Sequence, residues 1–280
     1  LPDLGVRWTF GVDGIAVPLV LLTAAIGVLV AAHAWVDLPA GGSPAAFLGC
    51  LLLVEAGALA TFTARDAVLF FVAFELVLVP MWVLISRYGD PHDAGARTEA
   101  GYRFVLYTAV GSTLMLVGIL TLVTSAGTSD LWALADGAGR ALTPDRQLLV
   151  AALLVAGLAV KVPVFPLHTW LPSAHTTAPT AGSVLLAAVL LKMGTYGLVR
   201  LPVATVPDGF ARLAPVLAVL GVVGIIWGGL ICLVERDLKR LIAYSSVAHM
   251  GFVVLALAAG SETGLQAALF ANIAHGVISA

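Results

Sequence analysis

Three ionisable side chains stand where the surrounding sequence is almost entirely apolar: Glu75, Lys161 and Lys192. An ionised group at the centre of a bilayer costs roughly 2.5 to 3.5 kcal/mol on insertion scales. Proteins keep such groups along ion paths, in proton relays and in counter-ion pairs. These residues therefore predict acid–base chemistry inside a membrane.

Glu75 and Lys161 are candidates for one another. The residues three and four positions away from each are apolar or glycine, so neither finds a partner on its own helix. A nearby opposite charge changes the proton affinity of a buried acid or amine. A Glu75–Lys161 pair whose separation changes would therefore act as a proton switch. The alternative is a static structural salt bridge.

Lys192 has Thr195 and Tyr196 one turn further along and no obvious carboxylate partner. A buried lysine without a counter-ion is the group best suited to gain and release a proton. We therefore expect Lys192 to carry protons. The alternative is a lysine that reaches the membrane interface along its aliphatic stem.

Two histidines and a second glutamate extend this set. His249 has serines one turn before it, and His275 has Asn272 on its helix face. Polar neighbours at helical spacing can hold water and pass protons, although each histidine alone would be a hydrogen-bonded packing residue. Glu55 is a further charge in an apolar stretch with no visible partner, and its alternative is a shallow, water-accessible position.

The composition requires a membrane around these residues. The chain is 60% hydrophobic and 11% charged, against roughly 25% charged residues in a soluble domain. A spanning helix needs about 20 apolar residues. About nine stretches qualify: 14–34, 45–63, 67–86, 104–124, 147–166, 180–199, 213–234, 240–258 and 265–280. We expect an all-α polytopic membrane protein, with an extramembrane lead-in over 1–13 and a single transmembrane domain over 14–280.

The fifth stretch is irregular. Pro163 and Pro166 lack an N–H, so the carbonyls of Ala159 and Val162 lose their helical partners. Lys161 lies between these carbonyls, and many transporters build an ion site from a discontinuous helix beside a buried charge. The alternative is a proline-kinked helix with a lysine that reaches the interface.

Other features exclude several classes of function. The net charge of −2 favours neither nucleic acid nor an anionic surface. Cys50 and Cys232 form no metal or disulfide pattern, and His168 and His175 are expected to be structural. The sequence contains no nucleotide-binding glycine motif and no cysteine cluster for an iron–sulfur centre. We therefore expect no redox chemistry in this chain.

The loops do not predict an orientation, because six basic residues fall on each side of the expected membrane. The chain also stops at Ala280 inside an apolar run. We expect it to be a fragment of a longer polypeptide.

Three segments resemble the antiporter-like subunits of respiratory complex I, the proton-pumping NADH:quinone oxidoreductases. They are FFVAFELVLVPMWVLI, VKVPVFPLHTWLPSAHTTAPTAGSVLLAAVLLKMGTYGLVR and RDLKRLIAYSSVAHMGFVVLAL. The subunit M (subunit 4) branch is the most similar, on HTWLPSAHTTAPTAGSV followed by LLKMGTYGL. GVDGIAVPLVLLT resembles the start of the family's third helix, so the likeness covers essentially the whole chain.

The resemblance implies a proton relay over six residues of this chain: Glu75, Lys161, Lys192, His249, His275 and Glu55. In the family the first is a helix-five glutamate, the second its ion-pair partner in the broken helix seven, and the third the central lysine of helix eight. The histidines resemble relay positions in helices ten and eleven, and Glu55 resembles a helix-four acid. The resemblance also implies one full helical repeat and part of a second, inverted one, truncated at both ends.

The implied function is proton translocation coupled to electron transfer in other subunits. FMN, iron–sulfur clusters and quinone would be bound by those subunits, and no cofactor or metal by this chain. The implied partners are the antiporter-like neighbours L and N and the lipid bilayer, with no nucleic acid. The Ala- and Gly-rich usage favours a bacterial plasma membrane over the mitochondrial inner membrane. The alternatives are a subunit of a cation/proton antiporter or membrane-bound hydrogenase, a passive membrane-arm scaffold, and a small-solute permease.

Overall fold

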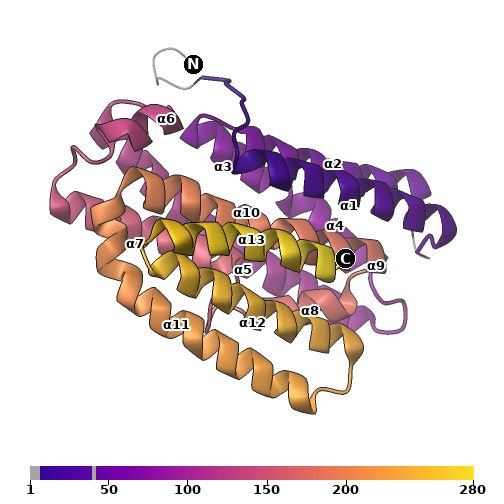
Figure 1. Ribbon diagram of the computed structural model, residues 1–280. Helices are drawn as coiled ribbons and strands as arrows, with labels where there is room; N and C mark the ends of the chain where they lie inside the picture. Colours follow the sequence, from indigo (N-terminus) through magenta and orange to yellow (C-terminus); the bar gives the residue numbers. More distant parts are fainter. Residues whose placement is uncertain (1–6, 40–41) are drawn as a thin grey trace.

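The computed structural model describes residues 7–39 and 42–280, which fold into a bundle of helices lying side by side (Figure 1). Within these residues, seven helical segments are long and apolar enough to cross a membrane. They are α1 (Ala16–Val36), α2 (Pro44–Thr63), α3 with α4 (Ala67–Tyr88), α5 (Ala94–Ala126), the segment Thr180–Val203, α11 (Pro207–Val234) and α12 (Leu238–Ala258). The predicted all-α membrane architecture is confirmed.

Two of the nine predicted spans do not meet the same criterion. α7 (Pro144–Lys161) carries Asp145 and Arg146 in its first turn and ends at Lys161, where the helix breaks. α13 (Glu262–Ile278) has 17 residues, fewer than the about 20 that a bilayer crossing needs. The predicted number of spans was therefore too high by two for the described residues.

Side-chain caps begin several of these helices. Asp66 accepts hydrogen bonds from the backbone of Val68 and Leu69 and begins α3 (Ala67–Leu76). α4 (Leu78–Tyr88) continues the same span after Val77. Asp237 caps α12 in the same way. Such a cap satisfies N–H groups that have no partner inside the helix, so these acidic residues mark helix starts at the membrane boundary.

The segment Thr180–Val203 occupies the centre of the bundle and is buried along most of its length. It consists of α9 (Thr180–Leu185), the π-helical turn η3 (Leu186–Leu190), α10 (Leu191–Leu198) and the π-helical turn η4 (Val199–Val203). α11, by contrast, is largely exposed on the outside of the bundle. The central position of α10 is what places Lys192 away from the surface.

The predicted break after Lys161 is present. The chain leaves α7, passes through turns and resumes as α8 (Trp170–Thr177), which packs against α5 and α12. On the other side of α7, the short elements α6 (Leu131–Ala133) and η2 (Leu134–Ala138) connect it to α5. Broken backbone of this kind is tolerated at membrane depth where protein covers it.

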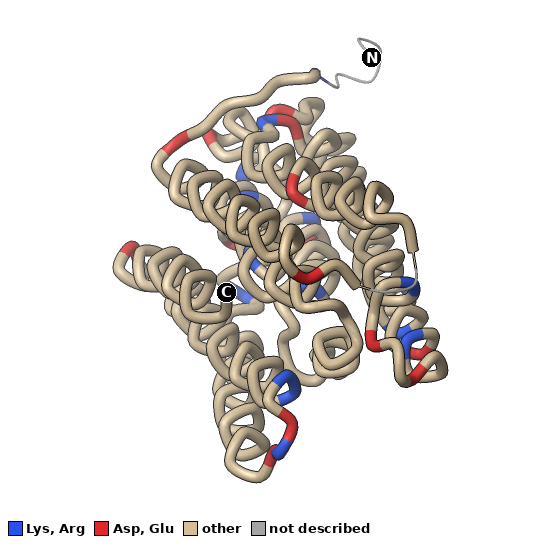
Figure 2. The backbone as a smooth tube through the Cα atoms, turned by 90° about the vertical axis from the view of Figure 1, so that its right-hand side faces the viewer, with Lys and Arg blue, Asp and Glu red and all other residues tan. Residues whose placement is uncertain are grey.

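Small residues allow close helix packing around the break. A Cβ atom added at Gly111 of α5 would lie 2.8 Å from the carbonyl oxygen of Gly157 on α7. This approach brings Ser112 toward the end of α7 that carries Lys161. Figure 2 shows that most acidic and basic residues lie in loops and at helix ends, so charged residues inside the bundle are exceptions.

Candidate functional site

Lys192 lies at the centre of the site. Its side chain is 0% exposed, and its Nζ lies 2.7 Å from the carbonyl oxygen of Ala187 and 2.5 Å from Nδ1 of His275. His275 is also buried and belongs to α13, which packs against η3 and α10. The partners of the amine are thus a backbone carbonyl and an imidazole nitrogen, and among the described residues no carboxylate lies within 4.0 Å of it.

The π-helical turn η3 provides one of these partners. In η3 the N–H of Leu191 bonds to the carbonyl of Leu186, five residues earlier. Lys192 Nζ in turn reaches the carbonyl of Ala187, also five residues before it. π-Helical turns leave backbone groups available for side chains and are frequent at functional sites.

A second hydrogen bond joins the same two helices. The Thr195 hydroxyl donates to Oδ1 of Asn272 at 2.9 Å, and both side chains are buried. Asn272 precedes His275 by three residues and therefore shares its helix face. The two contacts form a polar seam between α10 and α13, made of Lys192, Thr195, Asn272 and His275.

Lys161 occupies an aromatic pocket. Its side chain is 3% exposed, and its Nζ lies 5.1 Å from the ring centroid of Phe74 and 5.6 Å from that of Phe104. A cation near an aromatic face is attracted by the ring quadrupole, more strongly when water is excluded. The rings therefore stabilise a charge that has no carboxylate within 4.0 Å in the described part of the chain.

Glu75 faces the same pocket without direct contact. Its carboxylate accepts a hydrogen bond from the Ser112 hydroxyl on α5. Its charge acts on Lys161 through space, and the Phe74 ring beneath the ammonium belongs to the residue before it. The two predicted partners are thus not in direct contact. Glu75 is hydrogen-bonded to Ser112, and the Lys161 ammonium lies near the aromatic rings.

The backbone at the break differs from the sequence prediction. The carbonyl of Ala159 was expected to be free, but the N–H of Val164 donates to it at 2.9 Å. The indole of Trp170 donates to the next carbonyl, that of Val160, at 3.0 Å. Because Pro163 has no N–H, the next donor along the chain bonds to this carbonyl with i+5 spacing, so the prediction of a free Ala159 carbonyl was wrong.

The remaining predicted residues lie at the margin of the site. His249 is exposed instead of buried, because its ring has His275 on one side, at a centroid distance of 5.4 Å, and is open on the other. Its Nδ1 lies 2.7 Å from the carbonyl of Ser245. Glu55 is half-buried on α2 and leans against Gly27 of α1, where an added Cβ would collide with its carboxylate. Glu55 is therefore separate from the seam around Lys192.

His175 is a site residue that the sequence analysis assigned to structure alone. It is 2% exposed, and its Nε2 is buried with no hydrogen-bond partner among the described residues. The charges of Lys239 and Lys192 both act on it. The sequence signal was a histidine within a broken, proline-rich segment, but its burial depends on the fold.

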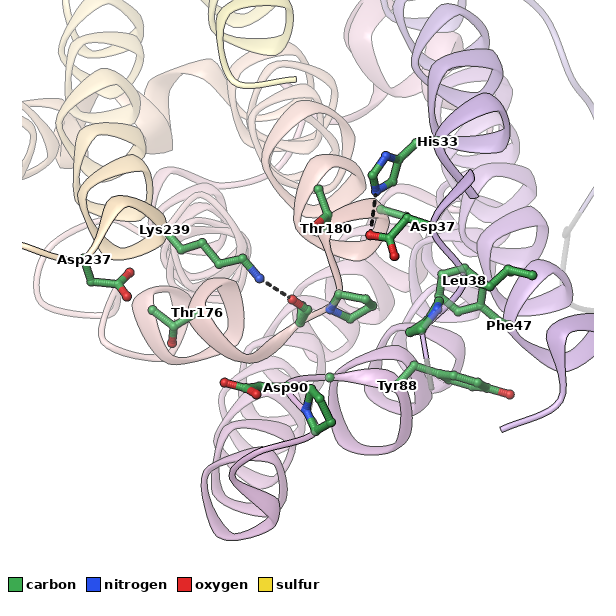
Figure 3. A pocket seen from close by; sticks show the side chains of 16 residues that line it. His33, Asp37, Leu38, Phe47, Tyr88, Asp90, Thr176, Thr180, Asp237 and Lys239 are labelled. Carbon is green, nitrogen blue, oxygen red and sulfur yellow. Dashed lines mark hydrogen bonds and ion pairs between the residues drawn. The ribbon is translucent and has the colours of Figure 1, made fainter. Parts of the chain in front are cut away.

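A hollow of about 470 Å³, which we call the Lys239 hollow, opens at the start of the segment Thr180–Val203 (Figure 3). Its lining includes Thr176, Thr180 and Lys239, and the Lys239 Nζ donates to the carbonyl of Ala178 at 2.9 Å. His33 and Asp37 face it from the end of α1. Its polar lining and a volume large enough for many waters make this hollow accessible to solvent.

The match to a family model decides the classification. Residues 64–280 match the family described as NADH:quinone oxidoreductase/Mrp antiporter, transmembrane. The chain belongs to this family. All of the seam around Lys192 and the broken helix lie within the matched residues.

Curated relatives resemble the chain over its whole length. The chain is 44% identical to NAD(P)H-quinone oxidoreductase chain 4 1 of Synechococcus elongatus and 41% identical to chain 4 3 of Trichormus variabilis, over 100% of its own length. Both alignments cover 51% of the relative, so the chain spans about half the length of the curated relatives it matches.

Two solved assemblies contain a similar fold. Respiratory complex I from Thermus thermophilus has a chain with a TM-score of 0.87 and 32% identity, covering 100% of this chain and 57% of that one. An Mrp complex from a Dietzia species gives 0.88 and 29%, covering 100% of this chain and 30% of that one. The chain is therefore similar in fold both to a chain of a respiratory complex I and to a chain of an Mrp complex.

Proposed function

We propose that this chain is a proton-translocating membrane subunit of an NADH:quinone oxidoreductase. Its residues would move protons through the membrane interior while electrons pass through other subunits. The observation that supports the proposal is the environment of Lys192, an amine whose partners are a backbone carbonyl and a histidine nitrogen and which has no counter-ion within residues 7–39 and 42–280. A lysine in this setting can exchange a proton with His275 through an existing contact.

We propose a route for the protons. They would enter from the Lys239 hollow, pass to Lys192 and continue to His275 and His249. The charge of Lys161 would influence whether the Lys192 amine holds a proton, because α10, which carries Lys192, packs against α7, which ends at Lys161. Movement of Lys161 toward or away from Glu75 would then change the proton affinity of Lys192, as in the switch predicted from the sequence.

The assignment to an NADH:quinone oxidoreductase is supported by the 41% and 44% identities to relatives that carry that name. We further propose the antiporter-like neighbours L and N as partners, flavin, iron–sulfur clusters and quinone in other subunits, and a bacterial plasma membrane as the location. A subunit of a cation/proton antiporter is a second candidate, favoured by the 0.88 TM-score to the Mrp complex.

The experiment that tests the proposal is substitution of Lys192 by Ala in the assembled complex. NADH-driven proton uptake into vesicles should fall well below the wild-type level. A passive scaffold predicts intact pumping per assembled complex. Sodium-dependent proton exchange that needs no NADH would identify the antiporter candidate instead.

A further inference from the structure

Two arginines lie close to one tryptophan at the end of the bundle opposite the Lys239 hollow. The guanidinium carbon of Arg65 lies 4.8 Å from the ring centroid of Trp132, and that of Arg200 lies 5.2 Å from it. Arg65 belongs to the turn between α2 and α3, Arg200 to η4 and Trp132 to α6. Three segments distant in sequence thus converge on a small pocket between these side chains.

The backbone holds Arg65 in place from two sides. Its N–H donates to the carbonyl of Thr9 at 3.0 Å, and its carbonyl accepts from the N–H of Leu131 at 2.9 Å. Its side chain passes over Gly11, where an added Cβ would lie 2.6 Å from the Arg65 Cδ. The Arg65 backbone is therefore held in place, and its side chain lies against Gly11.

The charge balance of the pocket is positive. Asp13 is hydrogen-bonded to Arg200 and leaves Arg65 without a carboxylate partner in the described part of the chain. Asp66, the residue next to Arg65, is occupied by the backbone N–H groups of Arg7, Val68 and Leu69 and by the Ser129 hydroxyl.

The lining of the pocket also suits an anion. Its described residues are Arg65, Arg200, Tyr196 and Trp132 together with small or aliphatic neighbours, and none of them is acidic. Arg65 Nε is buried and has no hydrogen-bond partner among the described residues. A guanidinium donates through a planar fork that fits phosphate oxygens.

The size and depth of the pocket select the form of the anion. It holds about 30 Å³, room for the terminal oxygens of a phosphate but not for a whole soluble metabolite. It lies where α2 ends, α3 and α1 begin and the segment Thr180–Val203 ends. These helix ends define the headgroup level of the membrane, and exposed Trp8 and Phe10 at the same end are typical of an interface.

We propose that Arg65, Arg200 and Trp132 form a binding site for the phosphate of an anionic phospholipid. The phosphate oxygens bind the free donors of Arg65 and share Arg200 with Asp13, while the acyl chains extend along the outer helices. Basic pockets between transmembrane helices bind such headgroups in other proteins. A bound lipid would tie the lead-in segment, α6 and η4 together at this end.

The test uses full-length protein purified in a neutral detergent. The thermal unfolding midpoint is followed during titration with phosphatidylglycerol, phosphatidylcholine or inorganic phosphate, and native mass spectrometry counts bound lipids per folded molecule. Arg65→Gln removes the free guanidinium. Arg140→Gln is the matched control, because Arg140 is an exposed arginine that does not line the pocket.

Phosphatidylglycerol should stabilise the wild type and Arg140→Gln, with little effect of phosphatidylcholine. Arg65→Gln should need about tenfold more phosphatidylglycerol for the same shift, as expected for the loss of one charge-assisted pair. Equal responses of Arg65→Gln and wild type would overturn the site. Stabilisation by inorganic phosphate equal to that by phosphatidylglycerol would retain the oxyanion site and reject the lipid as its occupant. If Arg65→Gln unfolds on purification, lipid counts on folded Gly11→Ala, which displaces Arg65, decide between the same outcomes.

Discussion

Lys192 and His275 lie 83 residues apart in the chain, and their side-chain nitrogens are 2.5 Å apart. When the amine is charged it donates to both the Ala187 carbonyl and Nδ1 of His275, which requires the imidazole proton to sit on Nε2. When the amine is neutral it can accept from Nδ1–H instead. The contact therefore persists in both protonation states with the roles of donor and acceptor exchanged.

Replacement of Lys192 by Arg should abolish most proton translocation although the positive charge remains. A guanidinium does not release its proton at physiological pH, so the exchange with His275 stops. We expect at least about a tenfold loss of coupled pumping, equivalent to about 1.4 kcal/mol. Lys239→Arg is the control, because a guanidinium can still donate to the Ala178 carbonyl. Wild-type pumping in Lys192→Arg would rule out Lys192 as the carrier.

Replacement of Glu75 by Gln should reduce NADH-coupled proton translocation while assembly is preserved. The amide oxygen can still accept from Ser112, so the variant removes the charge that acts on Lys161 and little else. Ser112→Ala, which keeps the carboxylate, should have a smaller effect. The proton-to-electron ratio in membrane vesicles measures both. A normal ratio in Glu75→Gln would refute the switch.

The seam between α10 and α13 should contribute measurably to stability. Thr195→Val leaves Asn272 Oδ1 without its donor, and we expect a loss of about 0.6 to 2 kcal/mol, typical of hydrogen bonds between transmembrane helices. The reciprocal variant Asn272→Leu and the double variant complete a mutant cycle. Unfolding in denaturing detergent measures each. Additive effects would mean that the two side chains are not coupled.

A methyl group at Gly194 should disturb the helix contact between the two buried lysines. An added Cβ there would lie 3.1 Å from the Lys161 Cβ and 2.9 Å from a methyl of Val162. Overpacking of this kind costs about 1 to 3 kcal/mol. Gly49→Ala is the matched control, since nothing lies within 4 Å of a Cβ at that position of α2. Equal thermal midpoints for the two variants would contradict the close contact.

The Asp13–Arg200 pair should make stability depend on acidic pH. Burial raises the pKa of Asp13, but the hydrogen bond from Arg200 and those from the Ala16 and Ile15 N–H groups outweigh it and hold the pKa below 3.8. Ionised Asp13 therefore stabilises the fold above about pH 4, the ordinary value for aspartate, and this contribution disappears as the pH falls through the lowered value. The wild-type unfolding midpoint should approach that of Asp13→Asn between pH 5 and about pH 2. A constant difference between the two proteins across that range would argue against the pair.

Much of this arrangement could be predicted from residue types and spacing. The break after Lys161 follows from two prolines, and the burial of Lys192 follows from the length of its apolar stretch. Both depend on local chemistry and helix period alone. The apolar segments likewise predicted the helical membrane fold.

The rest depends on how helices pack. Sequence spacing shows which face of α12 carries His249 but not whether another helix covers it, and that face is open. The i+5 bond from Val164 to Ala159 and the π-helical turn η3 have no sequence signature. The burial of His175 likewise depends on helix packing, because α5 and α12 cover α8.

The turn at Leu186–Leu190 holds one residue more than a regular α-helical turn would. Deleting any one of these five apolar residues would restore a continuous α-helix and rotate all that follows by about 100° relative to the preceding turn. The Lys192 ammonium group would then face a different neighbour. The Asn272 amide and the His275 imidazole of α13 would lose their hydrogen bonds to Thr195 and Lys192. The number of residues in this short segment is therefore as important to the contacts of Lys192 as the amine itself, and a deletion there would remove these contacts without changing any polar residue.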